Sequence, residues 1–127
     1  MLRSRRKSLA GVAILVLALV ATLAIVATVS AKQTLSLRAS ASGALKFNKK
    51  KLTARPGKTT IVMTNPSGSG LTHAIEVEGK GIEKRGRNVR PGHTSKVTVR
   101  LKRGRYTFYC PVDGHRQAGM KGTIVVK

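Results

Sequence analysis

Hydrophobic residues follow two different patterns along the chain. Residues 9–29 form one continuous apolar run that contains no charged residue. From about residue 44 onward, hydrophobic residues instead alternate with polar ones in short stretches separated by Gly, Pro, Ser and Asn. Alternation with a period of two is typical of half-buried β-strands, and no stretch in this part has the spacing of a helical stripe. The pattern therefore predicts an all-β domain.

Turn signals divide this region into short strands. Residues 55–57 (Arg-Pro-Gly) and 102–104 (Lys-Arg-Gly) predict turns, and a Pro, Gly and Ser segment at 65–70 interrupts the chain. Strands at this spacing favour an antiparallel sandwich or barrel. The expected strands are 45–47, 52–54, 58–65, 72–78, 93–101, 105–110 and 122–126, with a glycine-rich basic loop expected at 79–92.

The apolar run predicts a targeting or anchoring segment. It follows a basic cluster at residues 3–7, and Val29-Ser30-Ala31 offers a signal-peptide cleavage site after Ala31. The run is also long enough to span a bilayer as a hydrophobic helix. Residues 1–31 are thus expected to be a signal peptide or a membrane anchor, and Ser4-Arg5-Arg6 leaves Sec and twin-arginine export both open. In every case we expect the rest of the chain outside the cytoplasm: periplasmic, at the cell surface or secreted.

The domain organisation expected from these patterns has three parts. Residues 32–43 are rich in Ser and Ala and are expected to be a linker, with at most a short strand at 35–39. The domain proper is then expected to span residues 44–127. A chain of 127 residues is too short to be a multidomain enzyme.

The exported part is strongly cationic. The chain has 25 Lys and Arg against 4 acidic residues, a charge of +21, and the four basic residues before residue 32 leave +17 for the remainder. Such a charge favours acidic proteins, anionic membranes or polyanions of the cell envelope as partners. Nucleic acid is not expected, because three of the four aromatic residues cluster at Tyr106, Phe108 and Tyr109 and do not alternate with basic residues along the chain.

Candidate metal chemistry is concentrated near the carboxyl end. Cys110, His115 and Met120 follow one another at intervals of five. A thiolate, an imidazole and a thioether suit a soft metal, with copper the first choice, and His73 would complete a set of two His, one Cys and a weak Met ligand. A single cysteine excludes an intrachain disulfide, a zinc ribbon, a Cys-X-X-Cys pair and a dinuclear copper centre. Because Cys110 must lose its proton to bind, metal affinity is expected to fall at low pH.

Two segments carry a resemblance to a known family. YTFYCPVDGHRQAGMKGTIVV and, upstream, TARPGKTTIVMTNPSGSGLTHAIEVEG resemble the cupredoxins, the plastocyanin and azurin superfamily of exported blue copper proteins. The resemblance implies a Greek-key β-sandwich with one copper ion at one end. It also implies His73, Cys110 and His115 as equatorial ligands and Met120 as the axial ligand. Tyr109 would correspond in position to an aromatic residue on a proposed electron route.

Two residues depart from the family pattern. Ala74 stands where an asparagine commonly follows the first histidine, so the side-chain tie between the ligand loops is missing. Pro111 follows the cysteine and has no N–H to donate to the sulfur, which affects the tuning of the thiolate and of the reduction potential.

The function implied by the resemblance is that of a type 1 (blue) copper protein. Such a protein carries single electrons between redox partners through one copper ion, Cu(I)/Cu(II), and catalyses no reaction of its own. The charge of the exported part predicts a redox partner with an acidic surface, and electron exchange that slows as salt rises. Multicopper oxidases are excluded as close relatives, because one cysteine and one domain cannot supply a type 1 site and a trinuclear cluster together.

Three other hypotheses remain open at the level of sequence. A copper carrier or storage protein would use the same ligands and pass on metal in place of electrons. An enzyme could use Cys110 as nucleophile and His115 as base, with Asp113 as the acid nearest to orient it. A cationic protein could bind acidic polymers without any metal.

Other residues are expected to have structural roles. His93 follows a Pro-Gly turn and is expected on the surface. Met63 is expected in the core, as are Tyr106 and Phe108, which alternate with residues of the opposite face. Tyr109 is expected to face partly outward.

Overall fold

The computed structural model describes residues 24–25 and 31–127. The signal peptide or membrane anchor predicted at residues 1–31, with its hydrophobic helix, therefore lies almost wholly outside the described residues. Within the described part of the chain, no helix has both the length and the apolar character needed to cross a membrane.

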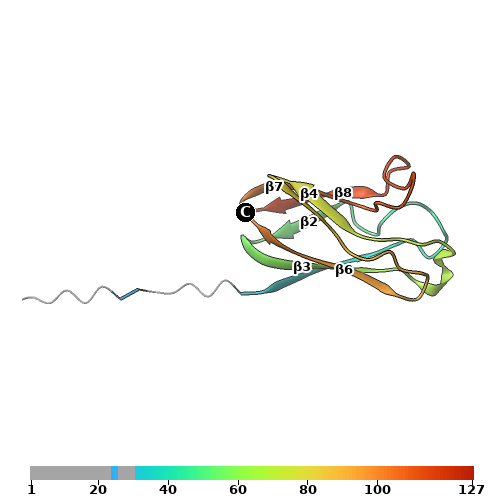
Figure 1. Ribbon diagram of the computed structural model, residues 1–127, viewed down its shortest axis with the longest axis horizontal. Helices are drawn as coiled ribbons and strands as arrows, with labels where there is room; N and C mark the ends of the chain where they lie inside the picture. The colour runs from blue at the N-terminus through green and yellow to red at the C-terminus, as the bar shows by residue number, and fades with distance from the viewer. Residues whose placement is uncertain (1–23, 26–30) are drawn as a thin grey trace, which may run out of the picture.

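Residues 31–127 fold into a sandwich of two β-sheets (Figure 1). One sheet has the strand order β1-β3-β6, and the other has the order β2-β8-β7-β4-β5. The described residues also form one short 3-10 turn, Ser67–Ser69. The architecture confirms the predicted all-β sandwich. The strands are β1 (Gln33–Arg38), β2 (Lys51–Ala54), β3 (Gly57–Thr64), β4 (Glu76–Gly79), β5 (Ile82–Arg85), β6 (Thr94–Leu101), β7 (Gly104–Tyr109) and β8 (Lys121–Val126).

Two strand pairs are parallel, whereas the sequence pattern predicts antiparallel pairing. β1 runs parallel to β3, with Leu37 beside Met63, and β2 runs parallel to β8, with Leu52 beside Ile124. The other four pairs among the described strands are antiparallel. β1 and β2 are consecutive in the chain but join the outer edges of different sheets. Turn signals identify hairpin neighbours and carry no information about such distant pairings.

The segment predicted as a linker at 32–43 contains strand β1. Leu37 and Ala39 are only 3% and 1% exposed, whereas Thr34 and Ser36, which precede them in the same segment, are exposed. The outward serines and threonine give the segment the composition of a tether, but its period-two alternation is that of a strand. The folded unit therefore begins near residue 33, and not at residue 44.

The inward faces of both sheets fill one core. Phe108 packs against Phe47 with ring centroids 5.7 Å apart. Gly122 on the neighbouring strand leaves room for the Phe108 ring, because a Cβ there would collide with it. Met63 and Tyr106 are also buried, so the three predicted core residues are confirmed. The largest fully buried side chains include Phe108, Ile61, Met63, Ile75, Leu101, Met120 and Ile124.

Two local predictions were wrong. Strand β5 lies within residues 79–92, which the sequence pattern predicts as a loop. Its three charged residues are exposed and only Ile82 is partly buried, because β5 is an edge strand, where charge prevents further pairing. Conversely, the strand predicted at 45–47 is reduced to a single bridge between Phe47 and Ala39.

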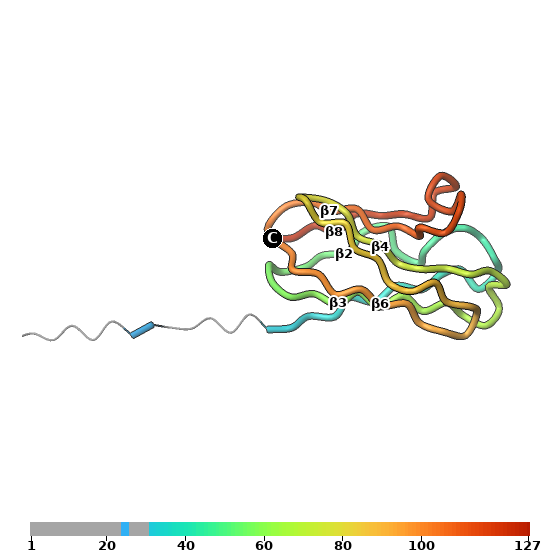
Figure 2. The backbone as a smooth tube through the Cα atoms, in the orientation of Figure 1, coloured from blue at the N-terminus to red at the C-terminus, as the bar shows by residue number. Residues whose placement is uncertain are grey.

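The two ends of the sandwich differ in structure (Figure 2). At the loop end, four long segments connect or extend the strands: 39–50, 65–75, 86–93 and 110–120. At the turn end, β1 begins, β8 ends, and tight turns join β4 to β5 and β6 to β7. The turn end comprises residues 31–33, 54–58, 79–82, 101–105 and 126–127.

Candidate metal centre

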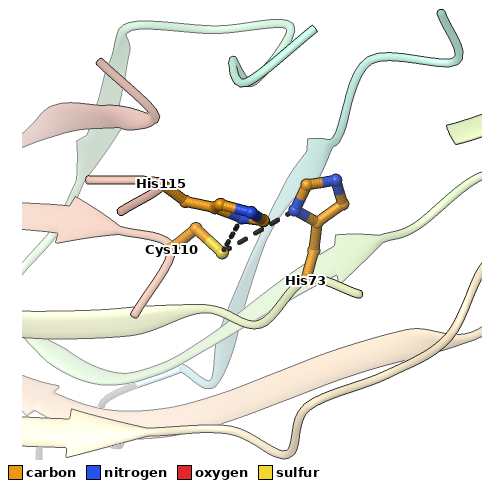
Figure 3. Close-up of side chains that lie close together, drawn as sticks. All are labelled: His73, Cys110 and His115. Atoms are coloured by element: carbon orange, nitrogen blue, oxygen red, sulfur yellow. Dashed lines mark hydrogen bonds between the residues drawn. The ribbon is translucent and has the colours of Figure 1, made fainter. Parts of the chain in front are cut away.

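Three of the candidate ligands meet at the loop end (Figure 3). His73 precedes β4, Cys110 directly follows β7, and His115 lies in the loop between β7 and β8. Sγ of Cys110 is 3.5 Å from Nδ1 of His115 and 3.7 Å from Nδ1 of His73. All three residues are buried. Among the described residues, they are the one group of three or more His, Cys, Asp or Glu close enough to share a metal ion.

Backbone hydrogen bonds hold the loop that carries Cys110 and His115. The N–H of Cys110 donates to the carbonyl of Met120 at 3.0 Å, and the N–H of Met120 donates to the carbonyl of His115 at 3.0 Å. The N–H of His115 donates to the carbonyl of Val112, which closes a turn between the two ligands. Met120, fully buried, is thus bonded through its backbone to both candidate ligands of the loop.

His73 is held by the neighbouring segment 86–93. Its N–H donates to the carbonyl of Val89 at 3.1 Å, and the N–H of Val89 donates back at 2.8 Å. The centre of its ring lies 5.0 Å from that of His115. Its Nε2 has no hydrogen-bond partner among the described residues, so packing and the backbone bridge orient the ring with Nδ1 toward Cys110.

A buried asparagine that the sequence analysis did not single out organises the approach to His73. Nδ2 of Asn65 donates to the carbonyls of Leu71, at 2.8 Å, and Val89, at 3.0 Å. Oδ1 of Asn65 accepts a hydrogen bond from the hydroxyl of Ser69 at 2.5 Å. One side chain thereby joins segment 65–75, which carries His73, to segment 86–93, which pairs with His73 through Val89. An Asn-Pro pair at the end of a strand usually signals only a turn, so the sequence gives no sign of this network.

Replacing Asn65 by alanine is expected to lower the free energy of unfolding of the metal-free protein by about 2–4 kcal/mol, because the buried Ser69 hydroxyl and the two partly buried carbonyls of Leu71 and Val89 lose a hydrogen-bond partner. Metal affinity is expected to fall as well, since the His73 segment loses its support. Urea denaturation followed by circular dichroism would measure the first effect. Asn88→Ala, which removes only an exposed bond to Arg85, is the control, and equal small losses in both variants would contradict the assigned role.

The backbone also joins the two ligand-bearing segments where the family's asparagine side chain is missing. The N–H of Ala74 donates to Sγ of Cys110 at 3.5 Å. A main-chain donor needs no particular side chain, which explains how alanine can occupy this position. Pro111 adds no such bond, because its nitrogen carries no hydrogen.

Burial controls the protonation of the metal-free cluster. Burial raises the pKa of the Cys110 thiol, and hydrogen bonds from the N–H groups of Ala74 and Val112 oppose that increase. Burial, and then the neighbouring His115, lowers the pKa of His73. At neutral pH the folded cluster therefore holds a neutral thiol and a neutral His73 imidazole. A bound cation must displace the thiol proton.

The donor set fits a single copper ion. The two imidazole nitrogens lie 3.5 and 3.7 Å from the sulfur, and all three donor atoms lie within 4.8 Å of one another, close enough to share one metal ion. Two imidazoles and one thiolate with a thioether nearby in the chain are the donors that blue-copper sites use.

Arg116 clamps the ligand loop to the five-stranded sheet. Its guanidinium forms an ion pair with Glu78 of β4 and lies 3.9 Å over the ring of Tyr109. Tyr109 is consequently only 6% exposed, so the expectation that it faces partly outward was wrong. The covering residue comes from a loop whose position the sequence pattern does not specify. Burial, and then the carboxylate of Glu76, raises the pKa of Tyr109 to about 12, so its phenol stays protonated at neutral pH.

Two other candidate residues lie outside the cluster. His93 is exposed, as expected. Asp113 is exposed too, and within the described part of the chain no hydrogen bond connects it to His115. A nucleophilic Cys110 with His115 as base would therefore lack the carboxylate that was expected to orient the base.

Comparison with known proteins points to copper binding. Residues 34–127 match the profile of a family described as copper binding proteins, plastocyanin/azurin family. Auracyanin A, a "blue" copper protein from the green thermophilic photosynthetic bacterium Chloroflexus aurantiacus, has a similar structure. Its identity is 22% and its TM-score 0.65, over 76% of this chain and 100% of that chain. An auracyanin from Roseiflexus castenholzii matches with 20% identity and a TM-score of 0.65, over 74% and 96% of the two chains.

A larger protein contains the same fold as part of its chain. The copper nitrite reductase from Nitrosomonas europaea matches with 20% identity and a TM-score of 0.61, over 76% of this chain but only 42% of the reductase. At these levels of identity the matched structures establish a shared fold.

Proposed function

The chain belongs to the plastocyanin/azurin family of copper-binding proteins, and on this basis we propose that it is an exported type 1 copper protein that carries single electrons between redox partners. Family membership makes it a cupredoxin that binds one copper ion. One observation carries the proposal: two imidazole Nδ1 atoms face one buried thiol at 3.5 and 3.7 Å.

We propose that His73, Cys110 and His115 would hold the copper ion, with Met120 as a weak fourth ligand. When bound, copper supplies a couple that gains or loses one electron. The chain supplies the remaining requirements. Burial keeps water from the donors, and the amide of Ala74 directs a hydrogen bond to the sulfur.

Rigidity supports electron transfer over other uses of the same ligands. A site whose ligand positions change little between oxidation states needs little rearrangement when an electron arrives. Here each ligand-bearing segment is fixed by backbone hydrogen bonds, to Met120 on one side and to Val89 on the other. Arg116 adds an ion pair that holds the loop to the sheet.

Export is proposed from the amino-terminal segment. A signal peptide or anchor within residues 1–31 would place the domain outside the cytoplasm. A free thiol would be open to oxidation there. Cys110 is fully buried, which is compatible with that environment.

The proposed redox partner has an acidic surface, because the charge of +17 on the exported part, 21 less the four basic residues before residue 32, attracts anions. The full chain loaded with Cu(I) is therefore expected to pass one electron rapidly to a small anionic oxidant, hexacyanoferrate(III), giving Cu(II) and hexacyanoferrate(II), and to do so more slowly as salt is added. Charges act over about 10 Å at 0.1 M salt and over less at higher salt. Stopped-flow measurements at low and high ionic strength would give the rates, with an uncharged oxidant as the control.

Adding a Cu(I) chelator to this experiment distinguishes an electron carrier from a copper carrier or storage protein. A Cu(I) chelator present during repeated oxidation and reduction should remove little copper from an electron carrier. Release of copper to the chelator in each cycle would contradict the proposal and favour metal carriage. A rate that does not depend on salt would leave the copper site in place but overturn the acidic partner.

A further inference from the structure

Basic residues are concentrated at the turn end, remote from the metal site. The segments that form this end contain no acidic residue. All four acidic residues of the chain lie elsewhere: Glu76, Glu78 and Glu83 on β4 and β5, and Asp113 at the loop end. The loop end has six basic residues on more than twice the chain length. The turn end has eight, all exposed: Lys32, Arg55, Lys58, Lys80, Lys102, Arg103, Arg105 and Lys127.

Part of this charge lines a cleft between the edge strands of the two sheets. The cleft has a volume of about 540 Å³ and lies between β5 and β6. Tyr106, at its wall, accepts a hydrogen bond from the N–H of Lys102 at 2.9 Å, which fixes the adjoining turn. No acidic side chain lines the cleft, so its cations have no counterion of their own. The basic lining residues are Lys58, Lys80, Lys84, Arg100 and Lys102.

Lys80 occupies a backbone conformation that lysine rarely adopts. Its φ is +48°, and among the described residues it is the one non-glycine residue with positive φ. A turn of this kind favours Gly, Asn or Asp, and a strained position is kept when its side chain has a use. The Lys80 side chain occupies the space that a Cβ at Gly104 would fill, so it extends from one turn across the next. The charge is thereby held at the turn end.

The chain enters the domain at this same end. β1 begins at Gln33, which pairs with Thr59 near the start of β3. Only residues 30–32 separate Gln33 from the apolar run at 9–29. An extended chain covers at most about 3.6 Å per residue, so the turn end lies within roughly 15 Å of the end of that run.

We propose that the turn end binds the headgroups of an anionic phospholipid bilayer, so that the domain stands on the membrane with its metal site directed away from it. The occupant is identified by charge and by position. A soluble polyanion could bind a basic surface at any place on the domain. A bilayer in which the apolar run 9–29 is embedded would instead place its headgroups beside the turn end, where the chain enters the domain. The inference goes beyond electron transfer and does not depend on bound copper; it rests on residues 9–29 remaining in the bilayer as an anchor, one of the two roles proposed for that segment.

The test uses the full chain in lipid nanodiscs. Lysines are acetylated with a water-soluble reagent, and the rate at each lysine is read by mass spectrometry. In discs that contain phosphatidylglycerol, acetylation of Lys58, Lys80, Lys84 and Lys102 is expected to slow severalfold relative to discs of phosphatidylcholine alone. Acetylation is expected to be the same in both discs at Lys46, Lys49 and Lys50 of the loop end and at Lys51, which follows them at the start of β2; these four are called the loop-end lysines.

Two variants of equal charge make the test specific. Changing the four cleft lysines to glutamine should weaken docking by roughly 100-fold or more, since each contributes separately near an anionic surface. Lys127, which also lies at the turn end and is unchanged in this variant, should then lose its protection. Changing the four loop-end lysines to glutamine removes the same charge and should leave protection of Lys127 intact.

Three results would overturn the proposal. Equal protection of both groups of lysines would mean attraction by net charge without orientation. Protection of neither group would mean that the turn end does not meet the headgroups. Protection by soluble polyphosphate, but not by anionic discs, would assign the cleft to an acidic polymer.

Discussion

With Cu(II) the protein is expected to acquire an intense visible absorption, and replacing Cys110 by alanine is expected to abolish it. That absorption requires a bond between copper and a thiolate, and Cys110 is the chain's single cysteine. The loss of affinity for Cu(II) should exceed the roughly 10–100-fold typical of losing a residue that only orients a ligand, because a direct donor is removed. Titration with Cu(II), followed by visible absorption and by competition with a chelator, measures both quantities.

His93→Ala is the matched control for this experiment. His93 is the one histidine of the chain that is not a candidate ligand, and it is exposed and lies outside the cluster. Its replacement should leave the absorption and the affinity unchanged, whereas His73→Ala should reduce both. An absorption band that survives in Cys110→Ala would refute the proposed ligand set. Indifference of copper binding to all these changes would favour a cationic polymer-binding protein.

Replacing Phe108 by alanine is expected to lower the free energy of unfolding by about 3–5 kcal/mol, the range typical of large cavities in a packed core. Small domains are stable by about 5–15 kcal/mol in total, so the loss is a large share of the whole. Phe108 is fully buried, packs against Phe47, and fills space left by Gly122. Urea denaturation of the metal-free protein measures the change.

Phe108→Leu separates the cavity effect from the loss of an aromatic ring. Leucine retains most of the buried volume, so Phe108→Leu should lower the free energy of unfolding by much less than Phe108→Ala. A loss of less than about 1 kcal/mol in Phe108→Ala would mean that the core collapses around the cavity. Because Phe108 lies in β7, two residues before Cys110, which directly follows that strand, we also expect the alanine variant to bind copper less tightly.

Strands and candidate ligands were predictable from the sequence for a common reason: both depend on short-range patterns. β3, β6, β7 and β8 alternate apolar and polar residues closely enough to be placed within one residue or so of their observed ends. The candidate ligands were identified by the chemistry of thiol, imidazole and thioether at regular spacing. The structure brings Cys110 and His115, five residues apart, together with His73, which lies 37 residues before Cys110.

Features that depend on distant segments were not predictable. The parallel pairing of β1 with β3 decides that residues 33–38 belong to the sheet, and nothing local to those residues identifies the partner. Tyr109 is covered by Arg116, whose position depends on the ion pair with Glu78, 38 residues away. Asn65 binds groups on two segments that become neighbours only in the folded protein.

The loop at 110–120 allows the candidate metal site to change in evolution independently of the β-sheet. Tyr109 and Lys121 face each other as the last pair of β7 and β8, so the sheet register is complete before the loop begins. Three of the four candidate donors lie within that loop. Insertions or deletions between Cys110 and Met120 can therefore alter donor spacing without shifting a strand. Selection could adjust the redox chemistry of such a protein in one short segment while leaving its stability largely untouched.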